Sequence, residues 1–251
     1  YLGRYLMTDL NIGSTFNIIT GIRFEDNKTS YNSYHGQSTV YPSFNSMGSD
    51  TASNHLRFNS YSLPALFLKY QPHDWIILRY ANTKTLTRPN YSDIIPLYNV
   101  SGQNRTVEYR NPFLEPGISK NNDYVVSFNN KYLGLLSFNY FTKRIQGLIF
   151  SSGQRVIEDP SKYGLPGFTA YYQINDYKTN NQYDTFLKGL ELDFQTRFWY
   201  LPSFLRGLVI NANYTRTKSK VKYPRTVIET KIIFEPSLEV ELKNIDSLYI
   251  D

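Results

Sequence analysis

Apolar and polar residues alternate along most of this chain, a pattern that predicts β-strands rather than helices. In residues 15–25, Ile18, Ile22 and Phe24 share one side of the expected strand, whereas Arg23 lies on the other. Eight segments of this kind are expected: Tyr1–Leu10, Thr15–Glu25, Ser60–Tyr70, Trp75–Thr87, Asp123–Asn130, Leu133–Ile145, Thr185–Phe198 and Gly207–Lys218.

The connections between these strands alternate in length. Short turns are expected at 11–14, 71–74 and 130–132, with an intermediate connection at 199–206. Long polar loops are expected at about 26–59, 89–122, 146–184 and 219–251, the last with a possible strand pair of its own. Transmembrane barrels combine short periplasmic turns with long external loops, so we interpret residues 1–251 as part of one β-barrel domain.

The two faces of the expected strands differ in chemistry. Leu192, Phe194, Leu208 and Ile210 lie on one face and are expected to contact lipid rather than a second layer of protein. The other face is polar and charged, with Arg79, Glu191, Asp193, Asn211 and Asn213. Lipid outside and water inside fits this pattern best, and the predicted fold class is an all-β, antiparallel, up-and-down transmembrane β-barrel. A soluble β-sandwich that binds carbohydrate, and a passive porin-like channel, stay open as alternatives.

Composition adds to this picture at a few points. The chain has 23 Tyr and 16 Phe, and aromatic residues form the interfacial girdles of membrane barrels. Trp199, Tyr200 and Phe204 are expected in the periplasmic girdle. No apolar run reaches about 18 residues, so no transmembrane helix is expected. There is no cysteine. The net charge is +6, but the basic residues are scattered along the sequence, so no nucleic-acid partner is expected.

Several stretches, in order along almost the whole chain, carry a family resemblance: GIRFE at 21–25, LPALFLKY at 63–70, WIILRYANTKTLTRPNYSDIIP at 75–96, NPFLEP at 111–116, FNYFTKRIQGLI at 138–149, KGLELDFQTRF at 188–198 and LPSFLRGLVINANYTRTKS at 201–219. The chain resembles the barrel region of TonB-dependent outer-membrane receptors, especially the type common in Bacteroidetes. The resemblance implies a plugged barrel of about 22 strands, of which about eight are present here.

The resemblance also implies function, location and partners. It implies a receptor in the outer membrane of a Gram-negative bacterium, in contact with outer-membrane lipid. Such a receptor takes up a scarce ligand (a ferric siderophore, cobalamin or an oligosaccharide) with energy from the TonB protein acting on an N-terminal plug. The plug, the energy-coupling box and the final strands of the family are not recognisable here. We therefore expect a fragment, with a plug and a signal peptide upstream of Tyr1.

Candidate ligand-binding residues lie on the polar face or in the loops: Arg79, Arg88, Tyr98, Tyr171 and Tyr172. Arginine attracts anionic ligands, and tyrosine offers contact area and a hydroxyl at low entropic cost. No enzymatic activity, cofactor or metal site is expected. The carboxylates Glu191 and Asp193 suit the inner face of a barrel strand better than an acid–base pair, and His35, His55 and His73 are isolated.

Overall fold

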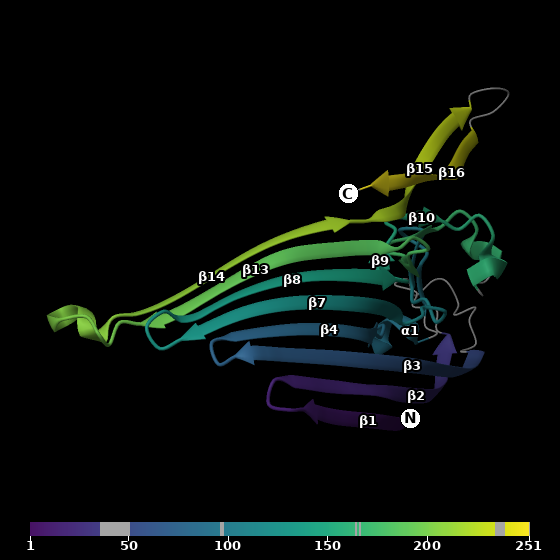
Figure 1. Ribbon diagram of the computed structural model, residues 1–251. Coiled ribbons are helices and arrows are strands. Elements are labelled where there is room, and N and C mark those ends of the chain that lie inside the picture. The colour runs from purple at the N-terminus through teal and green to yellow at the C-terminus, as the bar shows by residue number, and fades with distance from the viewer. Residues whose placement is uncertain (36–50, 96–97, 164, 166, 234–238, 251) are drawn as a thin grey trace.

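The computed structural model describes the chain except residues 36–50, 96–97, 164, 166, 234–238 and 251; side chains are also left aside at 32–35, 51–55, 99, 204, 233, 239–241, 246 and 249. Eight strands form one curved antiparallel sheet (Figure 1). In order across the sheet they are β1 (Leu2–Ile12), β2 (Phe16–His35), β3 (Thr51–His73), β4 (Ile76–Thr87), β7 (Gly117–Asn130), β8 (Gly134–Gln146), β13 (Thr185–Arg197) and β14 (Val209–Lys220). The predicted up-and-down antiparallel order is confirmed.

The short connections all lie at one end of this sheet, on the left of Figure 1. Gly13 and Gly134 adopt φ values of 62° and 79° there, a left-handed conformation that glycine tolerates without strain. The connection between β13 and β14 contains η3 (Ser203–Gly207). Trp199 and Tyr200 are exposed at this end, as the girdle prediction requires, whereas the side chain of Phe204 lies outside the described part.

At the opposite end the strands run further than the sequence pattern indicated. β2 continues to His35 and β3 begins at Thr51, within the loop expected at 26–59. Apolar alternation stops near Asp26, but the backbone ladder continues because polar side chains also pair across it. Ser60 Oγ donates a hydrogen bond to Asp26 Oδ1 at 2.7 Å, and Arg4 Nη2 lies 2.6 Å from Asp26 Oδ2.

The register of the large sheet keeps its two faces separate from strand to strand. Outside a bulge in β3, even-numbered residues pair with even-numbered residues, for example Leu136 with Phe194 and Phe194 with Ala212. The even-numbered face is apolar near the short turns. Leu190, Leu208 and Ile210 on it are 44%, 41% and 38% exposed, and no second sheet covers it among the described residues. A sandwich requires a second layer on that face, and the described sheet fits the barrel prediction better than the soluble-sandwich alternative.

The odd-numbered face is polar and hydrogen-bonded. Asn121 Nδ2 donates to the hydroxyls of Thr83 and Thr85, each at 3.2 Å, and the hydroxyls of Ser127 and Ser137 are 2.9 Å apart. Buried polar groups of this kind need partners, and the pairs across the strands supply them. This inner face fits a barrel that encloses water. No helix of the described residues is long and apolar enough to cross a membrane.

The remaining elements gather at the end with the long connections, on the right of Figure 1. They are α1 (Tyr91–Ile94), β5 (Tyr98–Ser101), β6 (Thr106–Tyr109), β9 (Ile149–Ser151), β10 (Arg155–Val156), η1 (Pro160–Tyr163), η2 (Gly167–Thr169), β11 (Gln173–Ile174) and β12 (Lys178–Asn180). β15 (Lys222–Ile233) and β16 (Glu239–Ile250) form a separate antiparallel pair, as the alternation in the last excursion suggested.

Candidate ligand-binding site at the loop end

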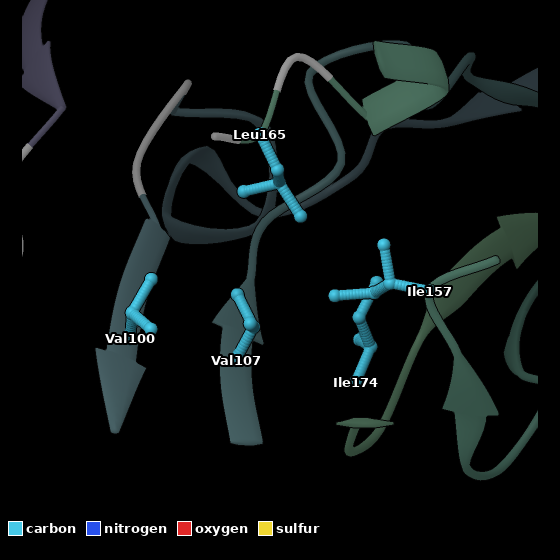
Figure 2. Packing of buried hydrophobic residues seen from close by; sticks show 5 residues of the cluster. All are labelled: Val100, Val107, Ile157, Leu165 and Ile174. Atoms are coloured by element: carbon cyan, nitrogen blue, oxygen red, sulfur yellow. The ribbon is translucent and has the colours of Figure 1, made fainter. Parts of the chain in front are cut away.

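The long connections fold into a small structured unit with a core of its own. β10, β11, β6 and β5 form a four-stranded sheet, in which β11 pairs with β6 in parallel. Figure 2 shows the buried side chains that hold it together: Val100, Val107, Ile157, Leu165 and Ile174, each 0–7% exposed. This unit, residues 98–109 with the described part of 155–177, is called the cap below.

Tyrosine rings surround the cap core. The ring of Tyr109 stacks on Tyr177 with centroids 6.1 Å apart and meets Tyr163 edge-on at 5.6 Å. The guanidinium of Arg155 lies 5.7 Å from the centroid of Tyr177, within cation–π range. Burial raises the pKa of the Tyr109 hydroxyl far above its ordinary value, and the neighbouring Tyr177 and Tyr163 raise that pKa further. The Tyr109 hydroxyl is therefore neutral at physiological pH.

Asparagine side chains connect the loops to one another and to the strand ends through hydrogen bonds. Asn180 accepts a hydrogen bond from the Glu115 amide at 2.7 Å and donates to the carbonyls of Glu115 and Gly147, at 2.7 and 2.9 Å. Asn111 Nδ2 donates to the carbonyl of Lys178 at 3.0 Å. Arg57, on β3, donates to the carbonyl of Leu114. The abundance of Asn in the loops was visible in the sequence, but nothing there indicated which backbone groups each amide would reach.

The two candidate arginines occupy different environments. Arg88, just past the loop end of β4, forms an ion pair with the carboxylate of Glu25, whose side chain is only 7% exposed. Arg23 Nε lies 2.8 Å from the same carboxylate. Arg79 lies nearer the short-turn end of β4 on the odd-numbered face, exposed, with no carboxylate of the described residues within ion-pair distance. Arg79 is therefore the freer cation, whereas Arg88 is engaged in a structural contact.

The three candidate tyrosines are brought to the same unit. Tyr98 and Tyr172 pack, half-buried, against the cap core, and burial raises the pKa of the Tyr98 hydroxyl. Tyr171 is 57% exposed and has a left-handed backbone, with φ 63°. Tyr171 thus offers the most accessible ring of the three. The assignment of these residues to ligand binding stays a prediction.

Glu191, Asp193 and His73 each contact a neighbouring side chain. Asn139 Nδ2 donates to Glu191 Oε2 at 3.0 Å across the inner face, and Gln195 Nε2 lies 3.4 Å from Asp193 Oδ2. His73 stacks on Trp75 with centroids 5.9 Å apart; the side chains of His35 and His55 lie outside the described part. Within the described residues, no group of three or more His, Cys, Asp or Glu side chains could hold a metal ion.

Three solved structures align with this chain at low sequence identity, and the first of them shares its fold. The copper transporter OprC superposes with a TM-score of 0.54 at 14% identity, covering 89% of this chain and 32% of its own. The hemophore receptor HasR of Serratia marcescens gives 0.46 at 13%, covering 99% and 45%. The ferric enterobactin receptor PfeA of Pseudomonas aeruginosa gives 0.48 at 14%, covering 89% and 38%.

The chain therefore spans less than half of the length of each of these structures. A comparison with curated proteins found no match. The family model for the β-barrel of TonB-dependent-receptor-like proteins matches residues 1–233, which is most of the chain. The alternating faces, the short turns at one end and the folded loops at the other agree with that match, and the chain belongs to the TonB-dependent receptor-like β-barrel family.

Proposed function

We propose that the protein containing this chain is an active-transport receptor of the outer membrane of a Gram-negative bacterium. In this proposal the loop end captures a scarce ligand outside the cell, the polar inner face passes it inward, and an N-terminal plug moves under force from TonB. The observation that carries the proposal is the eight-stranded sheet, apolar on its even-numbered face and polar on its odd-numbered face, with structured long connections at one end.

The cap is the part best suited to recognise the ligand. It presents tyrosine rings on a rigid core, and rigid aromatic anchors bind at low entropic cost. Arg79 supplies a positive charge further down the inner face. This combination suits an anionic ligand with aromatic or sugar rings, such as a ferric siderophore, more than an uncharged ligand. Cobalamin and oligosaccharides are the other classes that we consider.

The test uses the full-length protein in cells that lack other uptake routes for the ligand. Labelled ferric siderophores, cobalamin and oligosaccharides are offered in turn, with TonB present and with TonB deleted. We expect uptake of one class, dependent on TonB. Uptake that is equal without TonB would identify a passive porin-like channel and overturn the proposal.

A pair of tyrosine variants localises the binding site. Tyr171 in the cap and Tyr132 at the short-turn end are equally exposed, at 57% each. We expect Tyr171→Ala to weaken binding of the transported ligand to the purified receptor by about tenfold, because truncating an aromatic anchor typically costs more than 1 kcal/mol. Tyr132→Ala should leave this binding unchanged. Equal effects of the two variants would remove the cap from the proposed route.

A further inference from the structure

Basic side chains gather on the even-numbered face of the large sheet, beyond its apolar band. Tyr80, Tyr124 and Tyr140 lie side by side on that face, with ring centroids 5.0 Å apart for the first pair and 6.3 Å for the second. Tyrosine belts of this kind mark the level where the hydrocarbon of a membrane meets the head groups. Further along the same strands, toward the loop end, the same face carries Lys84, Lys120, Arg144, Lys188, Lys218 and Lys220.

These side chains line a groove. It has a volume of about 620 Å³ and runs over β7, β8, β13 and β14 near their loop ends. Its polar lining includes Lys120, Asn122, Thr142, Lys188, Lys218 and Lys220. Phe186 also lines it and pairs across the ladders with both Arg144 and Lys220, so an apolar ring separates two cations. The groove thus offers positive charge, hydrogen-bonding groups and an apolar wall together.

The lysine charges in the groove are not balanced by carboxylates of the described residues. Lys188 lies directly opposite Lys218, and Lys120 directly opposite Arg144, an arrangement in which like charges repel. Arg144 is paired with Asp184. Among the side chains that the structure describes, no carboxylate lies within ion-pair distance of the groove lysines. An external anion would relieve the repulsion, and a phosphate accepts charge-assisted hydrogen bonds from several lysines at once.

We propose that this groove binds the phosphate of a phosphorylated lipid of the outer leaflet. Long loops of outer-membrane barrels face the outside of the cell, which places the groove at the outer head-group level. The phosphate would contact Lys188 and Lys218, with Asn122 and Thr142 close by on the neighbouring strands. The acyl chains would lie on the apolar band that continues along the same face through Leu190 and Leu192.

The position of the groove separates it from the transport route. Four of its lysines, Lys120, Lys188, Lys218 and Lys220, occupy even-numbered positions, and Lys143 is the odd-numbered lysine of its lining. The candidate cation Arg79 and the hydrogen-bonded Asn121 occupy odd-numbered positions on the inner face. A transported ligand that follows the inner face does not meet these four even-numbered lysines. The apolar band that adjoins the lysines also favours a lipid over a free polyanion, because only a lipid uses both surfaces.

The experiment measures lipid binding to the full-length receptor in detergent. The probes are bisphosphorylated lipid A, the same lipid with both phosphates removed, and inorganic phosphate. We expect the phosphorylated lipid to bind, and to bind about tenfold more weakly to a Lys188→Gln/Lys218→Gln variant. Its binding should also weaken as ionic strength rises. The dephosphorylated lipid should not distinguish the variant from the wild type.

A control variant removes the same charge elsewhere. Lys69 on the odd-numbered face of β3 and Lys231 on β15 are outside the groove, so Lys69→Gln/Lys231→Gln should bind the phosphorylated lipid like the wild type. Lys188→Arg/Lys218→Arg, which keeps the charges, should retain binding and guards against a loss of folding. Equal binding of the two lipids, equal losses in both Gln variants, or inorganic phosphate binding as tightly as the lipid would each overturn the proposal.

Discussion

The large sheet and the cap are stabilised in different ways although they belong to one chain. Among the described residues, the buried apolar side chains are those of Ile94, Val100, Val107, Leu114, Phe141, Val156, Ile157, Leu165 and Ile174. Phe141 alone of these belongs to the large sheet. The sheet leaves its apolar face outward and relies on its backbone ladders and on lipid, whereas the cap has a protein core like that of a small soluble domain.

Because of this contrast, different kinds of substitution should be harmful in the two regions. Loss of apolar volume should harm the cap, where packing is internal. Gain of charge should harm the outer face of the sheet, where the surrounding medium is hydrocarbon. Four experiments test this contrast, in order of decreasing expected effect.

Ile174→Ala should affect the cap most strongly. Ile174 is fully buried in the cap core, and removal of its side chain leaves a cavity worth about 2–5 kcal/mol. Hydrogen exchange should report loss of protection in β5, β6 and β11, while the heat-modifiable migration of the barrel stays unchanged. Ile245→Ala, at a position 43% exposed on β16, is the control and should change neither measurement.

Leu192→Arg should affect the barrel rather than the cap. Leu192 lies on the even-numbered face between Phe138 and Tyr214 of the neighbouring strands, and a lipid-facing Arg costs about 2–4 kcal/mol at the membrane midplane. Urea titration in lipid vesicles measures the loss. Gln195→Arg, on the inner face of the same strand, should cost much less. A similar cost for the two variants would contradict the assignment of the faces.

Gly189→Ala tests packing on the inner face. A Cβ at Gly189 would lie 2.7 Å from Cε1 of Phe141 and 3.1 Å from the carbonyl oxygen of Arg216, so the ring must move. We expect a loss of about 1–3 kcal/mol by urea titration, partly restored when Phe141→Leu is added. Gly102→Ala meets no atom within 4 Å and serves as the control. An unchanged midpoint for Gly189→Ala would show that the ring is not held there.

The smallest effect concerns pH and the cap tyrosines. Because the pKa of Tyr109 is raised above its ordinary 10.0, its neutral form is favoured by folding, and this contribution is complete below pH 10 and lost as pH rises above it. The difference in tyrosinate absorbance between wild type and Tyr109→Phe should therefore appear only above pH 10. A difference that appears at pH 10 or below would show that the ring is solvated.

The sequence predicted the sheet better than the cap. Alternation located the eight strands and the short turns, because each barrel strand contacts hydrocarbon on one side and water on the other. The cap strands are only two to four residues long, and β11 pairs with β6 from a distant part of the chain. Such short strands carry no readable period, and their pairing depends on a core that forms only when both loops meet.

The candidate sites show the same division. Arg79 was expected on the inner face and lies there, but the pairing of Arg88 with Glu25 could not be foreseen because the two residues are far apart in sequence. The basic residues looked scattered along the chain. Only the register between strands brings Lys120, Lys188 and Lys218 together, and no local sequence pattern predicts this cluster.

The even-with-even register has a consequence for how such a chain can change in length. One residue added to the tight turn after His73 would reverse the alternation in the strand that follows. Its lipid-facing side chains would then face water, and its water-facing side chains would face lipid, until a second change restored the alternation. Two added residues would leave that alternation intact. The long connections at the cap end carry no such constraint. They lie outside the hydrocarbon, so they can absorb an added residue without changing which side chains face lipid. If the cap end binds the ligand as proposed, changes in that binding surface can therefore accumulate by insertions of any size, while the short turns tolerate only insertions of two residues at a time.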